Sequence, residues 1–530
     1  MPTEKSNSPS TGKLDSWLRA SKFSLGNPFA TTEASQERNL LPDFFVDVDG
    51  YEQIKGDRTV ITFAPRGGGK SALRIVLASY AAPVLPDAEV LAVEYINFSQ
   101  FLLKIRSGEK ITIDDYVDQL LRAGTEALFF TLFGYSPNKH HSNDEPEIRR
   151  RRIKRITHLI PPTRSRIAQW IRNYSPVNMR PEELYERLRA IKLAFSPDWR
   201  KFSKAVSTQK LKVLIEQSPL VDDEMANLLA ELNDFSIEEV ELLTSPLEKI
   251  SNFVALTRSC GFKYVQFLID GVDETIETAN NPETQADILE PLLAELRILE
   301  SPNVAFKFFL SREAHKEILE RPTIRRDRLT DRALTVEWTE EKLKALLDAR
   351  LDYFSNHAVQ ELIQICQDTM MESERRLPSS RMGEWIEREM LRSAKGSPRR
   401  LLTAGQLLFE AHVSHQNIKE LIELDDWECA KKELDRKMPL PLLTSPDLRK
   451  AWVGESEVEL TALNHKILIA LATAVNGVCE RDQLAFAAWG SKQGVTPQAI
   501  DKAVSRLREL LGDDPDDPIY LKTIRGKGVQ

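Results

Sequence analysis

Residues 63–74, FAPRGGGKSALR, form a glycine-rich turn between two patterns of different period. Residues 57–64 are a β-type apolar run, and after the turn the apolar residues recur at helical spacing. Further strand-like runs, separated by helical patterns, lie at residues 88–98, 262–274, 303–313 and 333–338. Strands that alternate with helices predict an α/β domain with a parallel sheet and helices on both of its faces.

The same turn has the composition of a phosphate site. Residues 64–71, APRGGGKS, match the spacing of a P-loop, except that Ala64 stands where the first glycine is usual. Backbone N–H groups in such a turn cradle phosphate oxygens, Lys70 would reach the β- and γ-phosphates of ATP, and Ser71 would bind Mg²⁺. A glycine loop that only connects a strand to a helix is the alternative. The predicted nucleotide-binding residues are Ala64, Pro65, Arg66, Gly67, Gly68, Gly69, Lys70, Ser71 and Ala72.

A P-loop needs a partner acid, and residues 267–274, FLIDGVDE, supply one. Asp270 directly follows apolar strand-like residues, which would put it at the carboxyl edge of the sheet as a Mg²⁺ ligand. Glu274 could orient the attacking water, and Asp273 is a second candidate for that catalytic role. The alternative is a solvated acidic turn after a strand.

The segment DGVDE resembles the Walker B motif of STAND ATPases, a branch of AAA-like P-loop proteins, particularly the NACHT and KAP types. FFLSRE (308–313) resembles their sensor strand, which implies that Arg312 lies near the γ-phosphate. KGSPRRLL (395–402) resembles the Gly-x-Pro of their lid, which implies Pro398 near adenine and Arg399 or Arg400 near phosphate, although a helix cap also explains GSP. The resemblance covers roughly residues 26–430. It implies a nucleotide switch that senses a signal and often oligomerises.

Two basic clusters have open interpretations. After the sensor strand come Arg325, Arg326, Arg328 and Arg332, where related ring-forming ATPases commonly offer an arginine finger to a neighbouring subunit. A solvated basic turn is the commoner explanation for any one of them. Residues 147–155, EIRRRRIKR, could contact nucleic acid, but an exposed charged helix is again commoner.

Residues of about 460–528 resemble the winged-helix DNA-binding domain of OmpR/PhoB-type response regulators. LTALNHKIL is similar to the opening helix of that family, and ERDQLAFAAWG to its second helix. TPQAIDKAVSRLRELLGDD resembles the recognition helix, and PIYLKTIRGKG the hairpin of the wing. This resemblance implies DNA as a partner of the C-terminal domain.

The spacing of the recognition helix agrees with this resemblance. One face, suited to a major groove, holds Gln498, Lys502, Ser505 and Arg506. The opposite, core side holds Ile500, Ala503, Val504, Leu507, Leu510 and Leu511. The predicted wing contacts to phosphate or a minor groove are Lys522, Arg525 and Lys527. Residues 449–530 hold eleven basic and eleven acidic residues, so a protein-binding winged helix is the alternative.

Composition sets limits on the whole chain. The net charge of −8 over 530 residues excludes an overall polycation, so any nucleic-acid surface must be local. Four scattered cysteines without metal-type spacing favour a reducing cytoplasm, without disulfides or zinc. The amino terminus is polar, and no run approaches about 18 apolar residues, so we expect a cytoplasmic protein with no membrane span.

We expect an α/β P-loop ATPase that acts as an ATP- and Mg²⁺-dependent switch and controls DNA binding, as a transcriptional regulator or in antiviral defence. We expect a homo-oligomer in the ATP state. An ATP-driven DNA-remodelling or transposition factor and a signalling scaffold whose winged helix binds protein are the alternatives. The predicted segments are a flexible lead-in (1–25), the ATPase core (26–338) with a helical insertion (about 110–245), a helical lid (339–435), a linker (436–455) and the winged helix (456–530).

Overall fold

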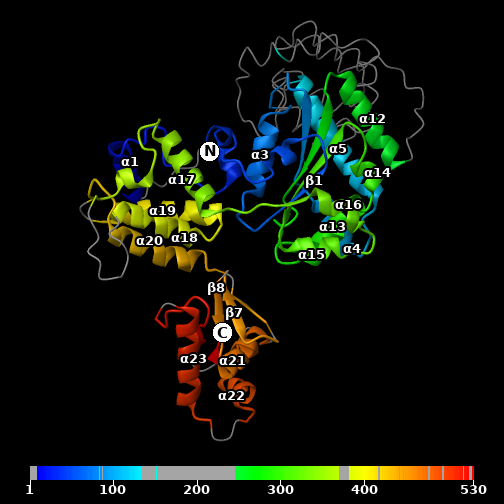
Figure 1. Ribbon diagram of the computed structural model, residues 1–530. Helices are drawn as coiled ribbons and strands as arrows, with labels where there is room; N and C mark the ends of the chain where they lie inside the picture. The colour runs from blue at the N-terminus through cyan, green and yellow to red at the C-terminus, as the bar shows by residue number, and fades with distance from the viewer. Residues whose placement is uncertain are drawn as a thin grey trace, which may run out of the picture. The chain divides into compact units, whose positions relative to one another are not determined.

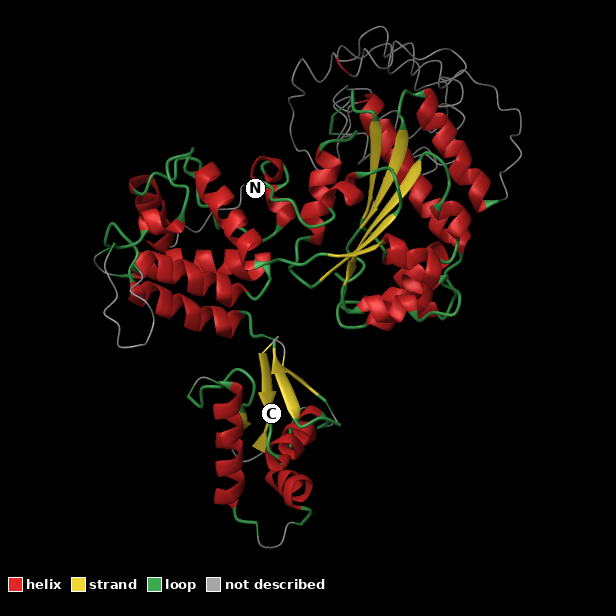
Figure 2. Cartoon of the chain, in the orientation of Figure 1, coloured by secondary structure: helices red, strands yellow, loops and turns green. Residues whose placement is uncertain are grey.

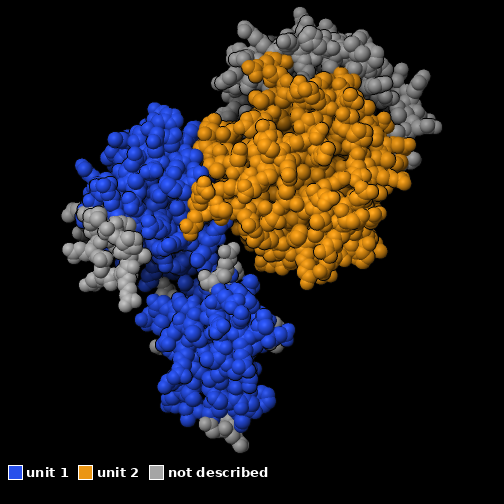
Figure 3. Space-filling view, in the orientation of Figure 1, with its two compact units in different colours: residues 1–32, 343–530 blue, residues 33–342 orange. Residues whose placement is uncertain are grey.

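The computed structural model describes residues 9–82, 84–85, 87–133, 151, 245–368, 381–415, 418–440, 442–445, 447–454, 456–474, 478–491, 495–516, 518–524 and 528–530. The chain divides into two compact units, residues 33–342 and residues 1–32 with 343–530 (Figure 3). None of the helices in these ranges is both long and apolar enough to cross a membrane.

Residues 33–342 are built on a five-stranded parallel sheet, as predicted. Its strands, in spatial order, are β2 (Val90–Tyr95), β3 (Tyr264–Ile269), β4 (Val304–Ser311), β1 (Val60–Ala64) and β5 (Ala333–Thr335). Every residue of β1 and β4 is buried, which is the pattern of strands covered on both faces. The rings of Phe267 and Phe306 stack across β3 and β4 with centroids 5.2 Å apart.

Helices lie on both faces of this sheet (Figures 1 and 2). Helix α3 contacts β1, β2 and β4, α5 contacts β2, and α12 contacts β3. The helices of the unit are η1 (Ala34–Glu37), η2 (Leu41–Phe44), α2 (Tyr51–Lys55), α3 (Lys70–Ser79), α4 (Ser99–Ser107), α5 (Ile113–Phe133), α12 (Pro246–Ser259), α13 (Pro282–Leu293), α14 (Leu296–Leu299), α15 (Ala314–Leu319), α16 (Arg326–Leu329) and η5 (Thr330–Arg332). Helix α5 opens the predicted helical insertion, and most of that insertion lies outside the described residues.

The register of the strands positions the candidate site. Strand β4 pairs with β1 on one side and with β3 on the other, and Ala64 at the end of β1 lies opposite Ser311 at the end of β4. Asp270 follows β3 directly, and its backbone N–H donates to Tyr95 O at the end of β2 (3.2 Å). The ends of four strands therefore meet at one edge, where the glycine-rich turn also begins.

The chain is helical over most of residues 340–437, of which residues 343–437 belong to the second unit, and this agrees with the helical region predicted there. It contains α17 (Glu340–Phe354), η6 (Leu362–Ile365), α18 (Met382–Ala394), α19 (Pro398–Ser414) and α20 (Leu424–Lys437). Phe409 on α19 contacts aromatic rings of the amino-terminal segment. Its ring centroid lies 5.0 Å from that of Phe29 and 5.9 Å from that of Phe23. This part of the chain therefore has its own core.

The prediction of a mobile lead-in over residues 1–25 is wrong from residue 9 onward. Residues 9–20 form helix α1 (Pro9–Ala20), which packs against α19. Trp17 is 4% exposed, its ring centroid lies 4.9 Å from that of Phe409, and its indole N–H donates to Glu420 O (3.2 Å). A few buried aromatic side chains anchor this segment despite its polar composition.

The last part of the second unit is a small domain of strands and helices. It contains β6 (Leu442–Thr444), β7 (Lys450–Val453), β8 (Ser456–Glu459), α21 (Ala462–Ala472), α22 (Arg481–Trp489), α23 (Pro497–Leu511), β9 (Thr523–Ile524) and β10 (Gly528–Val529). The first three strands form an antiparallel sheet, and β9 and β10 form a hairpin. The predicted linker at 436–455 therefore holds two strands of this sheet.

A glycine on α19 tests the packing of the amino-terminal segment. A β-carbon on Gly405 would lie 2.6 Å from the fully buried ring of Phe29, so Gly405→Ala should lower the free energy of unfolding by about 1–3 kcal/mol. Gly12 on α1 has open space around its β-carbon position, so Gly12→Ala should stabilise the chain by up to about 1 kcal/mol. Denaturant titrations of both variants measure the difference. Equal stabilities for the two variants would contradict the packing described here.

Candidate functional site

The glycine-rich turn requires glycine for geometric reasons. Gly67 and Gly69 have φ angles of 77° and 88°, in the region that side chains rarely adopt. The N–H of Gly68 donates to Pro65 O (2.9 Å), and a β-carbon on Gly68 would lie 2.9 Å from that oxygen. The turn is therefore tight. Because its three consecutive glycines have no side chains, the backbone of the turn is open to contact by another group.

Helix α3 begins at Lys70, directly after this turn. Gly69 is its N-cap residue and supplies no side-chain hydrogen bond, so the N–H groups of the first turn face the loop. Lys70 is buried, and its Nζ donates to Asp273 Oδ2 (2.9 Å). The structure therefore brings the predicted phosphate lysine and one of the predicted catalytic acids into direct contact.

Asp270 is the most enclosed acid of the site, with an exposed fraction of 2%. Its Oδ2 accepts a hydrogen bond from Arg74 Nε (2.9 Å), whereas Oδ1 has no hydrogen-bond partner among the described residues. Burial of an unpaired carboxylate oxygen is costly, so this atom lies where a cation or donor would be accommodated.

Sequence reasoning missed the arginine that contacts this acid and the ion pairs that continue from that arginine. Arg74 also contacts Glu94 at the end of β2, and Glu94 contacts Arg38. The spacing of Arg74, four residues after Lys70, is one helical turn and could have indicated that both side chains face the same edge. Nothing in the local sequence points from Glu94 or Arg38 to this network.

Glu274 has a carboxyl group with altered titration. Desolvation, together with the charges of Asp270 and Asp273, raises the pKa of Glu274, and the charge of Arg74 opposes that shift. A carboxyl with a raised pKa is a better proton acceptor near neutral pH than an ordinary one. Glu274 and Asp273 therefore differ in environment: Asp273 contacts Lys70, and Glu274 lies among acids.

Two further side chains lie beside the turn. The backbone N–H of Arg312 donates to Ala64 O (3.0 Å), and its guanidinium lies 3.4 Å from Glu337 Oε1. Trp338, which the sequence did not single out, donates its indole N–H to Gly68 O (3.0 Å). The predicted sensor arginine is thus adjacent to the end of β1, and its side chain is exposed and faces Glu337.

Pro398 and Arg399 belong to the other compact unit, so their predicted approach to the nucleotide stays a prediction. Pro398 is the first residue of α19, and Ser397 caps that helix by accepting the N–H of Arg400 (3.3 Å). The guanidinium of Arg400 is buried against Ser393 O, Asp435 and Met438 O. The helix-cap explanation of GSP is therefore confirmed, and Arg400 joins α18 to the end of α20.

The other predicted cationic sites gain little support. Arg325 pairs with Asp327 (2.9 Å) and Arg332 with Glu300 (2.6 Å), so both have intramolecular acidic partners. The basic run at 147–155 lies outside the described residues except for residue 151. Within the described ranges, no group of three His, Cys, Asp or Glu side chains is arranged to hold a metal, so Mg²⁺ would depend on Ser71, Asp270 and the nucleotide itself.

Helix α23 has the two faces that the sequence predicts. Thr496 caps it by accepting the N–H of Ala499 (3.3 Å), and Gly512 ends it with a φ of 68°. Its exposed face holds Gln498, Lys502, Ser505 and Arg506, and its buried face holds Ile500, Ala503, Val504, Leu507 and Leu511. Leu510, predicted to be in the core, is 41% exposed because it lies at the edge between these faces.

Helix α23 also holds the wing in place. The guanidinium of Arg508 donates to Leu521 O (2.7 Å) and Thr523 Oγ1 (2.8 Å). The carboxylate of Asp513, which is 4% exposed, accepts the N–H groups of Ile519, Tyr520 and Leu521. Lys522 is exposed at the base of the hairpin, whereas Arg525 and Lys527 lie outside the described residues.

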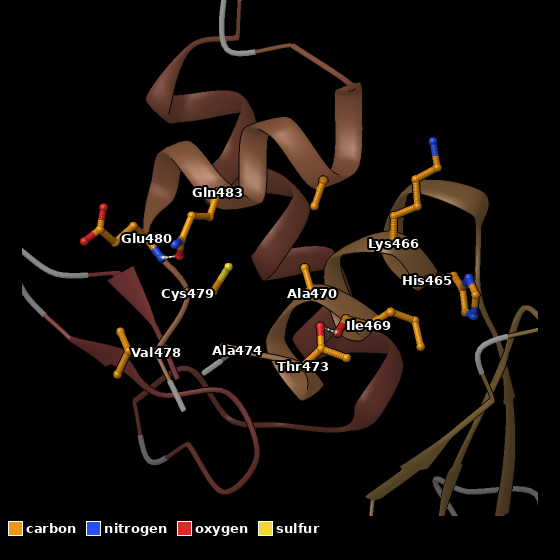
Figure 4. Close-up of a pocket in the computed structure, with 11 residues that line it drawn as sticks. His465, Lys466, Ile469, Ala470, Thr473, Ala474, Val478, Cys479, Glu480 and Gln483 are labelled. Carbon is orange, nitrogen blue, oxygen red and sulfur yellow. Dashed lines mark hydrogen bonds between the residues drawn. The ribbon is translucent and has the colours of Figure 1, made fainter. Parts of the chain in front are cut away.

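A groove of about 770 Å³ lies between α21 and α22 in the same domain (Figure 4). Its walls include His465 and Lys466 on α21 and Glu480 and Gln483 at the start of α22. His465 Nε2 lies 2.8 Å from Ser445 O, and Glu480 N donates to Gln483 Oε1 (2.9 Å). The His465 ring and the Gln483 amide in this groove are thus engaged in local hydrogen bonds.

Known proteins resemble the C-terminal domain. The family "Transcriptional regulatory protein, C terminal" matches residues 455–530. The alkaline phosphatase synthesis transcriptional regulatory protein PhoP of Bacillus subtilis is 35% identical over 85 residues, 16% of this chain and 35% of that protein. The regulatory protein VirG of Agrobacterium fabrum is 38% identical over 82 residues, 15% of this chain and 32% of that protein. The chain thus spans about a third of the length of the curated relatives it matches.

A solved structure is also similar to this region. It is the RstA DNA-binding domain of Klebsiella pneumoniae in complex with the RstA box, with 32% sequence identity and a TM-score of 0.16 over 17% of this chain and 87% of that chain. The family match supports the predicted OmpR/PhoB-type winged-helix DNA-binding domain. The nucleotide site remains a prediction from its own residues.

The exposed face of α23 gives a test of DNA contact. Lys502→Ala and Arg506→Ala should each cost about 1–3 kcal/mol on a preferred DNA sequence and relax the preference at one position. Lys522→Ala should weaken all sequences alike and reduce the slope of log affinity against log salt by about one. The measurement is a series of DNA titrations over a range of salt concentrations.

Lys466→Ala is the matched control for these titrations. Lys466 is an exposed lysine of the same domain, but it lies on α21 at the groove and not on α23. It should leave the affinity for DNA and its salt dependence unchanged. If Lys466→Ala weakens binding as much as Arg506→Ala does, α23 is not the reading helix.

Proposed function

We propose that this chain is an ATP-dependent switch whose nucleotide state controls DNA binding by the C-terminal winged helix, with transcriptional regulation as the output. The observation that carries the proposal is the grouping of Lys70, which contacts Asp273, with Asp270 and Glu274 at one sheet edge, beside a glycine turn, in a chain that also has a DNA-binding domain. The names of the similar regulators PhoP and VirG support the regulatory output.

The residues present fit a bound Mg–ATP. The glycine turn has no room for a side chain at Gly68, where a β-carbon would lie 2.9 Å from Pro65 O, so only backbone groups line this part of the turn. Oδ1 of Asp270 is buried without a hydrogen-bond partner among the described residues, and carboxylate oxygen is a ligand that Mg²⁺ prefers. Lys70 and the turn would hold the phosphates, and Ser71 and Asp270 would hold the metal.

When bound, Mg–ATP supplies the transferable phosphoryl group and concentrates charge at the turn. Lys70, which contacts Asp273 here, would hold the phosphates through its charged amine. Arg74 keeps Asp270 oriented through Nε while Oδ1 remains available. Glu274, whose pKa is raised, accepts the proton of the attacking water.

The switch interpretation also accounts for the composition of the DNA-binding domain. Equal numbers of acidic and basic residues in 449–530 give it little general attraction to phosphate. ATP-driven oligomerisation would place several such domains on one DNA molecule, and their affinities would compound through effective concentration. A weak individual domain is therefore compatible with tight, ATP-controlled binding by the assembly.

The nucleotide site is tested by two variants. Lys70→Ala removes the phosphate-facing cation and should weaken ATP binding about 10- to 100-fold, in the range of a hydrogen bond to a charged group. Glu274→Gln should retain ATP binding and slow hydrolysis about 10²- to 10⁴-fold, because only proton transfer is lost. Calorimetric ATP titrations and phosphate release measure the two effects. Full hydrolysis by Glu274→Gln together with none by Asp273→Asn would reverse the assignment of these acids.

The pH dependence of hydrolysis gives an independent test of Glu274. Its carboxyl must be ionised to accept a proton, so the rate should fall as the pH decreases through its raised pKa. Asp273→Asn removes a neighbouring negative charge, which should lower the pKa of Glu274 and move this acidic limb to lower pH. The measurement is the hydrolysis rate as a function of pH for the wild-type protein and for Asp273→Asn. If the acidic limb lies at the same pH in both, a group other than Glu274 limits the rate.

A further inference from the structure

Trp338 contacts the backbone of the glycine turn in two ways. Its indole N–H donates to Gly68 O across 3.0 Å. Its ring lies over the next residue, because a β-carbon on Gly69 would be 3.6 Å from Cζ2 of Trp338. The side chain therefore covers the peptide between Gly68 and Gly69 from one side.

The geometry of a peptide bond gives this contact a consequence. A trans peptide is planar, and its C=O and N–H point in opposite directions. Because Trp338 holds Gly68 O toward itself, the N–H of Gly69 points away from Trp338. The backbone dihedral angles on both sides of this peptide belong to glycines, which have few steric restrictions, and Gly69 has a φ of 88°. Without the contact to Trp338, this peptide would therefore rotate easily.

The position of Trp338 is fixed independently of the turn. Strand β5 pairs with β1, and just beyond it the N–H of Val336 donates to Phe63 O (2.8 Å). Glu337 contacts the guanidinium of Arg312 at the end of β4. The segment that carries Trp338 is therefore attached to two strands of the sheet, and Trp338 can hold the turn without being held by it.

We propose that Trp338 is a positioning residue for phosphate binding, which sets the Gly68–Gly69 peptide so that the N–H of Gly69 is directed at the phosphates of the nucleotide. This inference rests on the proposed nucleotide function and adds to it a residue outside the P-loop. It assigns Trp338 to the phosphate chain of the ligand and not to the base.

The test compares Trp338→Phe with the wild-type protein, using ATP and inorganic tripolyphosphate as probes. Phenylalanine keeps an apolar ring over Gly69 but cannot donate to Gly68 O. The affinities for both probes should fall by the same factor, about 2- to 10-fold, which is the range of one neutral hydrogen bond. Addition of tripolyphosphate should also change the tryptophan emission of the wild-type protein and leave that of Trp338→Phe unchanged.

Trp489→Phe is the matched control, because Trp489 is a partly exposed tryptophan on α22. It should bind both probes as the wild type does and retain the emission change.

If Trp338→Phe unfolds at a lower temperature, the titrations are made below the start of its transition. Weaker ATP binding with unchanged tripolyphosphate binding would assign Trp338 to the base and overturn the proposal, as would unchanged binding of both. Wild-type protein that binds neither probe would instead contradict the proposed function itself.

Discussion

The pairing of β4 between β1 and β3 is the constraint on which the candidate nucleotide site depends. Parallel strands in register end at the same edge, so the turn after β1, the acid after β3 and the arginine after β4 are brought together although they are far apart in sequence. Trp338 reaches the same edge because β5 pairs with the other side of β1. A shift of β4 would move the acid after β3 and the arginine after β4 away from the turn.

Burial at this edge also explains the pattern of ion pairs. Lys70, Arg74 and Asp270 are each less than 10% exposed, and buried charges without partners are strongly destabilising. Lys70 therefore contacts Asp273, and Arg74 contacts both Asp270 and Glu94. In the proposed function a phosphate would replace the carboxylate that pairs with Lys70, whereas the pair with Arg74 would keep Asp270 in position.

Much of this site could be predicted from the sequence, because continuous apolar runs, a GKS turn and an acid at the end of a strand each have a local cause. The long-range partners could not. Arg38, Glu94 and Trp338 reach the site only through strand pairing and the path of the chain after β5. Helix α1 was missed because three buried side chains, Trp17, Leu18 and Phe23, determine its packing within a polar segment. On α23 the helical period predicted both faces, and only Leu510, at their boundary, was misplaced.

The proposed function requires that ATP binding and DNA binding be coupled in one chain. Coupling of two binding equilibria is reciprocal, so the factor by which ATP strengthens DNA binding must equal the factor by which DNA strengthens ATP binding. The direct measurement uses Glu274→Gln, to avoid turnover, and determines the DNA affinity with and without ATP and the ATP affinity with and without DNA. We expect two equal factors well above one, and no coupling when Lys70→Ala is added. Two factors of one would show that the domains act independently and would contradict the proposed function.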